Sequence, residues 1–168
     1  MNLVELAVRM VDLKAEMNAA EQRIIARSAH AIQQTAKSAI GTYQFGWEPL
    51  AQSTIDRKAH GDTPLLETGQ LRDSIEVTLG HREAWVGTND GKAKWMELGT
   101  SKAPARPFMG PAAIASHDKI EKIISAEMKH AVHGHGHGEL WEALHEVYDL
   151  GKEAVEAGDE YLSGDRKK

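Results

Sequence analysis

Apolar side chains recur at alternating steps of three and four residues along the N-terminal part of the chain. The spacing of this stripe places it on one face of a helix, and Gly41 is a suitable helix end. The pattern predicts one long helix, or two helices joined by a kink near residues 26–28. The stripe passes through Leu3, Leu6, Met10, Leu13, Met17, Ala20 and Ile24, then shifts by one residue and continues through Ile25, Ala29, Ile32, Ala36 and Ile40.

A continuous helix over this segment would span roughly 55 Å at about 1.5 Å per residue. A small domain does not need a helix of that length for its own core. We therefore expect the helix to fold back, or part of it to pack on a neighbouring subunit.

The middle of the chain reads as a loop followed by a hairpin. Glycine and proline interrupt residues 41–68, which is typical of a loop, and Thr68 can cap a short helical turn. Alternation of apolar and polar residues over 75–79 predicts a strand, and residues 85–88 predict the returning strand. Residues 95–98 could form a third strand or a helical turn, because four residues are too few for periodicity to decide.

Two further helices are predicted in the C-terminal part. Residues 99–111 are rich in Pro, Ala and Gly and form an extended connection, after which Pro111 suits the first position of a helix. Alternating His and Gly over 133–138 ends that helix. Its apolar face comprises Ala112, Ile114, Ile120, Ile123, Ile124 and Met128, and the last amphipathic stripe comprises Leu140, Trp141, Leu144, Val147, Tyr148 and Val155.

The sequence thus predicts an α+β fold with a C-terminal appendage. The long N-terminal helix and a second core helix pack on a small antiparallel sheet, and an extra helix follows. We expect a ring-forming core domain over 1–131, a His/Gly linker over 132–138, and an acidic amphipathic helix with a tail over 139–168.

Charge and composition narrow the function classes. The 168 residues include 20 basic and 25 acidic side chains and no cysteine. Residues 131–168 carry 4 basic and 9 acidic side chains, which accounts for the whole net charge of −5. The absence of a basic stripe argues against nucleic-acid recognition. No apolar run approaches the roughly 20 residues of a membrane span, and the first residues do not have the pattern of a secretory signal.

Candidate chemistry is sparse. His130, His133, His135, His137 and His145 could supply imidazole ligands to a metal, which leaves a metal-dependent hydrolase as one alternative. The glycines between these histidines instead favour a flexible linker that binds metal only adventitiously. Nucleophile and phosphate-loop motifs are missing, so we predict a protein that is not an enzyme, with no catalytic, cofactor-binding or metal residue. A soluble adaptor that binds a partner helix is a second alternative.

Four ordered motifs between residues 47 and 113 resemble those of small tail-completion and neck proteins of tailed bacteriophages. Residues 68–75, TGQLRDSI, resemble the "TG-x-L-x-x-S-I" signature; residues 97–100, ELGT, resemble "E-F-G-T"; and residues 104–108 read "P-A-R-P-F". Upstream, Trp47-Glu48-Pro49-Leu50 with Thr54 and Lys58 is similar to the Mu-like virion morphogenesis branch. Leu98 replaces the usual aromatic residue, and Lys92 stands where Tyr is common.

The resemblance implies a head–tail connector, tail-terminator or tail-completion subunit. Such a protein assembles as a cyclic homo-oligomer, a hexamer in this family, and contacts portal, adaptor or tail-tube proteins. It is found in the virion neck or tail, and in the host cytoplasm during assembly.

The sequence also predicts which residues form a subunit interface and which anchor the fold. Prolines at 104 and 107 hold their loop extended, so we expect Arg106 and Phe108 to point outward and, with Glu97 and Thr100, to form a subunit interface. Pairing of Arg106 within its own subunit is an equal alternative. Trp47, Leu71 and Ile75 are expected to be structural anchors. Core or interface positions are also predicted for Trp85, Trp95 and Trp141.

Overall fold

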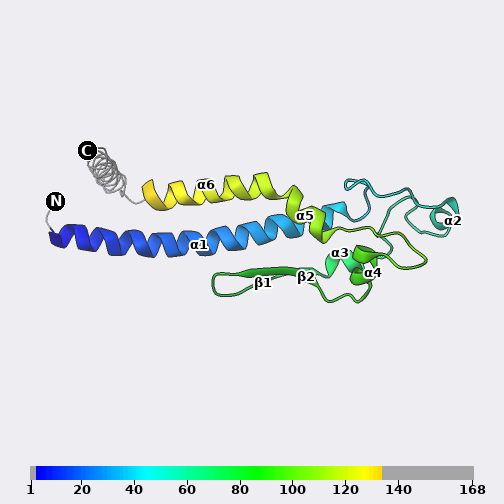
Figure 1. Ribbon diagram of the computed structural model, residues 1–168, viewed down its shortest axis with the longest axis horizontal. Coiled ribbons are helices and arrows are strands. Elements are labelled where there is room, and N and C mark those ends of the chain that lie inside the picture. The colour runs from blue at the N-terminus through cyan, green and yellow to red at the C-terminus, as the bar shows by residue number, and fades with distance from the viewer. Residues whose placement is uncertain (1–2, 134–168) are drawn as a thin grey trace, which may run out of the picture. The chain divides into compact units, whose positions relative to one another are not determined.

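The computed structural model describes residues 3–133 (Figure 1). Helix α1, Leu3–Ala39, has 37 residues and runs without a break, so the structure shows the first of the two predicted alternatives, one long helix. The linker was predicted over 132–138, but residues 132 and 133 belong to helix α6, His117–His133. The rest of that linker and the acidic helix predicted over 139–168, with Trp141, lie outside the described residues. None of the described helices is both long and apolar enough to cross a membrane.

The chain divides into two compact units, and α1 runs through both. Of the described residues, 3–20 and 128–133 belong to the first unit. Within it Ala20, Ala131 and Val132 are buried, whereas Val4 and Val8 on the first turns of α1 are exposed.

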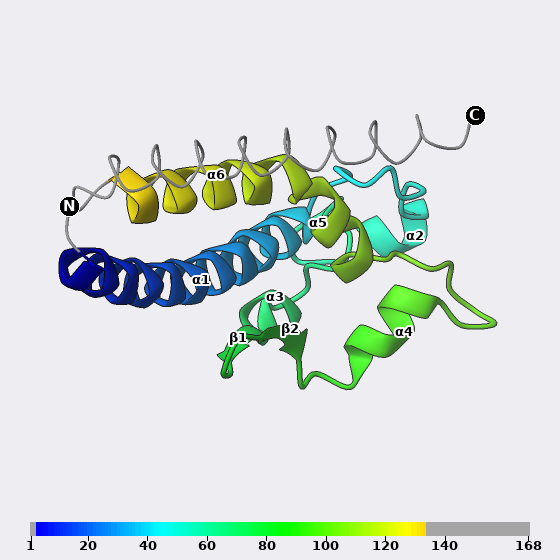
Figure 2. The ribbon, with the colours of Figure 1, turned by 60° about the vertical axis from the view of Figure 1, so that its left-hand side comes forward.

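The second unit, residues 21–127, contains the remaining elements. Figure 2 shows the short helix α4 as a separate element after the two strands. In chain order the elements are α2 (Gln52–Ile55), α3 (Gln70–Asp73), β1 (Ile75–Leu79), β2 (Ala84–Thr88), α4 (Lys92–Leu98), α5 (Met109–Ala115) and the larger part of α6 (His117–His133).

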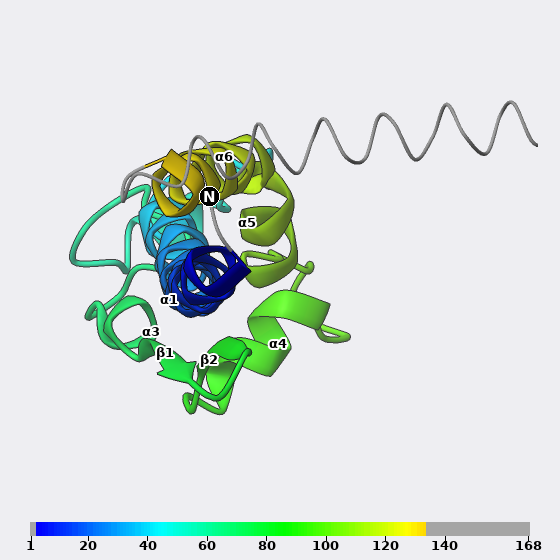
Figure 3. The same ribbon diagram turned by 90° about the vertical axis from the view of Figure 1, so that its left-hand side faces the viewer.

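The two strands form an antiparallel hairpin, as the alternating pattern predicted. Val77 pairs with Val86 at its centre, and Ile75 pairs with Thr88 at one end. At the other end the Gly80 N–H donates to the Glu83 carbonyl at 2.9 Å and closes the turn. Figure 3 shows the strands side by side between α3 and α4.

The core of this unit forms where α1 ends and the loop begins. Alanines on α1 present little bulk, which lets other segments approach the helix backbone closely. Large side chains from the loop, from α3, from the hairpin and from the residue just before α5 fill the remaining space. The buried cluster consists of Ala36, Ala39, Ile40, Trp47, Leu71, Ile75, Ala93, Phe108 and Ala112.

Within this unit, α6 runs antiparallel to the second half of α1. Ser116 Oγ lies 2.9 Å from Thr35 Oγ1 at one end of the contact. At the other end, Glu127 accepts hydrogen bonds from Arg23 and Arg27. These polar contacts fix the register between the two helices.

The described elements confirm the predicted α+β fold, with a long N-terminal helix and a small antiparallel sheet.

Two local predictions need correction. Residues 95–98 belong to helix α4, and the helix expected to begin at Pro111 is divided into α5 and α6. Ser116 lies at the division, where its Oγ bonds to the Ala112 carbonyl at 2.8 Å, a back-bond that bends helices. Ile114 and Ile124, predicted on the apolar face, are exposed.

Candidate functional site

Trp47 connects two of the motifs that carry the family resemblance. Its indole is buried beside Phe45, and Nε1 donates to the Pro107 carbonyl at 3.0 Å. A buried indole needs such an acceptor. The polar loop is thereby joined to the segment before α5, and Trp47 is placed where the predicted anchor would have to lie. Leu71 and Ile75, the other two predicted anchors, are also buried.

Glu97, at the end of α4, caps helix α5 with its carboxylate. Oε2 accepts the backbone N–H groups of Phe108 and Met109 at 2.8 and 3.1 Å, and Oε1 accepts that of Gly110 at 3.1 Å. These N–H groups have no partner within the helix, and a negative charge at this end is stabilised by the helix dipole. Sequence reasoning placed Glu97 at a subunit interface, whereas both carboxylate oxygens are occupied within the subunit.

Phe108 was expected to point outward, and this prediction is wrong. The residue is fully buried, with 0% of its surface exposed. The segment with the two prolines contains no helix or strand, but it lies along the core, bonded to Trp47 and Met96, so the Phe108 side chain is not exposed. Phe108 thus helps to anchor the start of α5.

Arg106 is paired within its own subunit, the second of the two predicted alternatives. Its Nη2 donates to the Glu48 carbonyl at 2.9 Å, and its backbone N–H donates to the Met96 carbonyl at 2.7 Å. Arg106 Nε is buried and has no hydrogen-bond partner among the described residues. The guanidinium therefore connects the first motif to the last, as Trp47 does.

Thr100 closes a tight turn just after α4. Its backbone pairs with Ala103, and its Oγ1 accepts the N–H groups of Lys102 and Ala103 at 3.2 and 3.1 Å. The preceding Gly99 has φ of +75°, and a Cβ there would lie 2.8 Å from the Ala105 nitrogen. The glycine is therefore required both by its backbone conformation and by the close approach of residue 105.

Hydrogen bonds also hold the long loop between α1 and α3. The Tyr43 hydroxyl donates to Asp62 and accepts the Leu50 N–H at 3.1 Å. Its bond to Asp62 raises the pKa of Tyr43. The Lys58 ammonium donates to the Leu66 carbonyl at 2.6 Å and to Glu67 at 2.9 Å, which lowers the pKa of Glu67.

A small pocket lies between the residues before α3 and the start of α4. Its volume is about 100 Å³, and Glu67, Asp90 and Lys92 contribute charged groups to it. Small-molecule sites usually occupy about 300–1,000 Å³. We therefore do not assign a substrate to this pocket.

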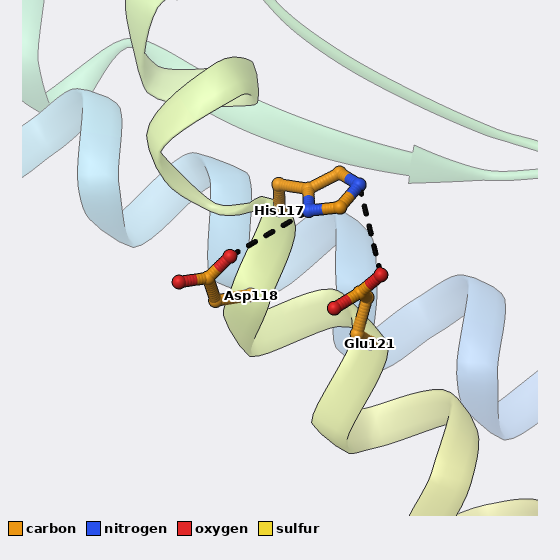
Figure 4. Close-up of side chains that lie close together, drawn as sticks. All are labelled: His117, Asp118 and Glu121. Carbon is orange, nitrogen blue, oxygen red and sulfur yellow. Dashed lines mark ion pairs between the residues drawn. The ribbon is translucent and has the colours of Figure 1, made fainter.

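In the described part of the chain, one group of His, Asp and Glu side chains lies close enough to share a cation. His117 lies 3.6 Å from Asp118 and 3.9 Å from Glu121 on the first turns of α6 (Figure 4). All three side chains are at least 66% exposed, and weak contacts at such exposure contribute little energy. Of the histidines predicted as alternative ligands, His130 and His133 are exposed, and the other three lie outside the described residues.

Several large apolar side chains are left uncovered by the second unit. Trp85 and Trp95 expose 57% and 58% of their surface, and Leu98 exposes 70%. The second unit therefore does not bury Trp85 or Trp95 in its core, which was one of the two positions predicted for them; the other was an interface. From the sequence, Trp85 and Trp95 were predicted at core or interface positions, and the subunit interface was predicted around Arg106 and Phe108.

The chain matches no protein-family model, no curated protein and no solved structure. Interpretation of the site therefore depends on the motifs and on the geometry described above.

Proposed function

We propose that this chain is a non-enzymatic structural subunit of phage virion morphogenesis, a head–tail connector, tail-terminator or tail-completion protein that forms a ring at the neck. The supporting observation is that three of the four segments carrying the resemblance converge in one hydrogen-bond network, while the fourth, residues 68–75, contributes Leu71 and Ile75 to the same buried cluster. Trp47 bonds to Pro107, Arg106 bonds to Glu48, and Glu97 caps the helix that follows the last motif.

These contacts support a similarity to that family in the fold of the subunit rather than in catalytic chemistry. Motif residues that bond to backbone groups of other motif segments specify how the chain folds, and they are not available to a substrate. A similar order of motifs therefore favours a similar subunit.

The exposed apolar residues support an assembling protein. Aromatic side chains are enriched at the centres of protein interfaces, and covering an exposed aromatic group with a partner stabilises the complex. Trp95 and Leu98 lie three residues apart on α4, so they share one side of that helix. We propose this side as a subunit contact, in place of the interface predicted around Phe108.

The proposed partners are further copies of the chain in a cyclic oligomer, a hexamer by family resemblance, and portal, adaptor or tail-tube proteins of the same particle. The proposed location is the virion neck or tail, reached from the host cytoplasm during assembly. A ring needs complementary side surfaces on each subunit, and no catalytic group is required.

Electron microscopy of the purified full chain, combined with light-scattering mass, tests this proposal. We expect closed rings of uniform diameter and a mass several times that of one 18.4 kDa chain. A monomer at all concentrations, which also fails to join purified heads or tails, would contradict the proposal and favour the adaptor alternative. Metal-dependent hydrolysis that is lost with a chelator would favour the hydrolase.

A further inference from the structure

Strand β2 forms an open edge of the hairpin. The described residues form a sheet of only two strands, and such a hairpin is marginally stable by itself. On the β1 side, the Ile75 carbonyl already accepts Gln33 Nε2 at 2.8 Å. The β2 side has no such contact from the rest of the described chain.

The register identifies the backbone groups at this edge. Bonded and non-bonded pairs alternate along an antiparallel ladder, and the Gly80–Glu83 bond fixes the alternation. The bonded pairs inside the hairpin are therefore Thr78–Trp85 and Glu76–Gly87. The backbone N–H and C=O groups of the three alternate residues of β2 point to the open edge; these residues are Ala84, Val86 and Thr88.

This edge has none of the usual protection against pairing. Edge strands are commonly blocked by Pro, Lys, inward charges or bulges, but β2 reads AWVGT and its ladder is regular. The strand carries no charge that would repel an identical strand.

The outer face of the sheet is complementary to itself. A Cβ added to Gly87 would have no heavy atom within 4 Å, so the space above this residue is open. A groove runs over the face, lined by Glu76, Thr78, Trp85 and Gly87 among others. Trp85 projects from the same face two residues before the glycine and is 57% exposed.

We infer that β2 pairs antiparallel with β2 of a second copy of this chain, with Val86 on the two-fold axis. This register sets Ala84 opposite Thr88, so all the outward backbone groups of both strands find partners. It also sets Trp85 opposite Gly87 in a non-bonded pair, where Cα atoms approach to about 4.5 Å. Each indole thereby covers the glycine of the other copy, beside the carboxylate of Glu76, which can accept the indole N–H.

The ends of the paired strands are also compatible. The same register places the turn that carries Arg82 near Asp90 of the second copy. Within its own chain Arg82 already pairs with Glu21 at 2.9 Å, so Asp90 would share that guanidinium with Glu21 and the end contact adds little. A contact formed by five-residue strands lies at the low end of interface sizes, where complexes are weak. We therefore expect a dimer that depends on protein concentration.

A two-fold contact closes at two copies and cannot by itself produce a ring. The inference therefore does not depend on the proposed function: it describes pairing of free subunits, or of two rings, through a surface separate from Trp95 and Leu98.

Val86→Pro tests the backbone pairing in the full-length chain. Proline removes an N–H that points away from β1, so the ladder inside the hairpin keeps its bonds. Sedimentation velocity over a concentration series should show the dissociation constant rising at least tenfold. Hydrogen exchange at Ala84, Val86 and Thr88 in the wild type should slow as concentration rises.

Gly87→Val is the second variant, because Val86→Pro could also weaken the fold. Valine raises strand propensity but fills the space required by Trp85, so the dimer should weaken while thermal stability does not fall. Leu79→Val is the control, because Leu79 lies on β1, away from the open edge, and on the face opposite to Gly87; it should leave dimerisation unchanged. A wild-type chain that stays monomeric, or an oligomer unchanged by both Val86→Pro and Gly87→Val, would overturn the inference.

Discussion

At the scale of single residues, the Glu97 carboxylate links the end of α4 to the first turn of α5. It accepts three backbone N–H groups, and water could replace it only in part because the Phe108 side chain is buried. Loss of an acceptor leaves its donors unpaired, which costs more than the bond itself contributes.

We therefore predict that Glu97→Ala lowers the free energy of unfolding by about 1–3 kcal/mol. Urea denaturation followed by circular dichroism measures the change. Glu48→Ala is the control, because that side chain is exposed and only its backbone carbonyl is used. Equal stability of the two variants would show that the cap contributes nothing.

Trp47→Ala should have a larger effect, about 3–5 kcal/mol, because it removes a large buried side chain and leaves a cavity. Trp47→Phe should cost less, since it keeps part of the packing and loses the bond to the Pro107 carbonyl. Trp95→Ala is the matched control at an exposed position. The same denaturation midpoint in all three variants would contradict an anchoring role.

Residue-level prediction from the sequence succeeded where burial follows from local pattern. Ile75 lies on the inward side of an alternating strand, and Trp47 is a large apolar residue in a polar loop. Prediction from the sequence failed for Phe108, because the direction of that side chain depends on which surface of the protein the loop crosses. That surface is formed by α1 and the loop around Trp47, and their proximity is a property of the tertiary fold.

At the scale of elements, Glu127 holds α6 against α1. The carboxylate is nearly buried and bonds to Arg23 at 2.6 Å and to Arg27. These two guanidinium groups hold the pKa of Glu127 below its ordinary value of 4.5. These two ion pairs contribute modestly to the stability of the fold, since both arginines are partly exposed.

The sign of its pH dependence follows from that lowered pKa. Because the folded protein binds this proton less readily than the unfolded chain, the stabilisation is complete above the unfolded pKa. It is lost as the pH falls below about 4.5 toward the folded value. We predict that Glu127→Gln costs about 1–2 kcal/mol at pH 7 and progressively less in acid.

Urea denaturation of wild type and Glu127→Gln at a series of pH values measures this difference. Glu121→Gln, on an exposed turn of the same helix, serves as the control and should show little change at any pH. A difference between wild type and Glu127→Gln that does not shrink in acid would contradict the assignment.

The elements themselves were largely predictable because their patterns are local. The α1 stripe, the loop and the alternating hairpin residues each define one element. The division between α5 and α6 was not predictable, since Ser116 is an ordinary residue for a helix until Thr35 lies beside it.

At the scale of the whole molecule, the proposed assembly depends on residues that the subunit leaves exposed. The motif residues Trp47, Glu97 and Arg106 are occupied by contacts within the chain. Sequence motifs therefore indicated the fold but not the interface. Exposed fraction, which depends on the folded structure, separates Trp95 from Trp47 although both are tryptophans.

We predict that the double variant Trp95→Ser and Leu98→Ser keeps the fold but impairs ring assembly. Both side chains are mostly exposed on α4, so their loss removes little buried area from the subunit. Interface aromatic residues often contribute about 2 kcal/mol or more each, and in a ring this loss recurs at every contact.

Phe108→Ala is the contrasting variant, because Phe108 is fully buried and its truncation should cost about 3–5 kcal/mol of folding free energy. Circular dichroism melting and light-scattering mass, measured on both variants at matched concentration, separate the two effects. The double variant should melt like the wild type and have a smaller mass, whereas Phe108→Ala should melt at lower temperature. A double variant that still forms rings of wild-type mass would exclude the α4 surface from the subunit contact.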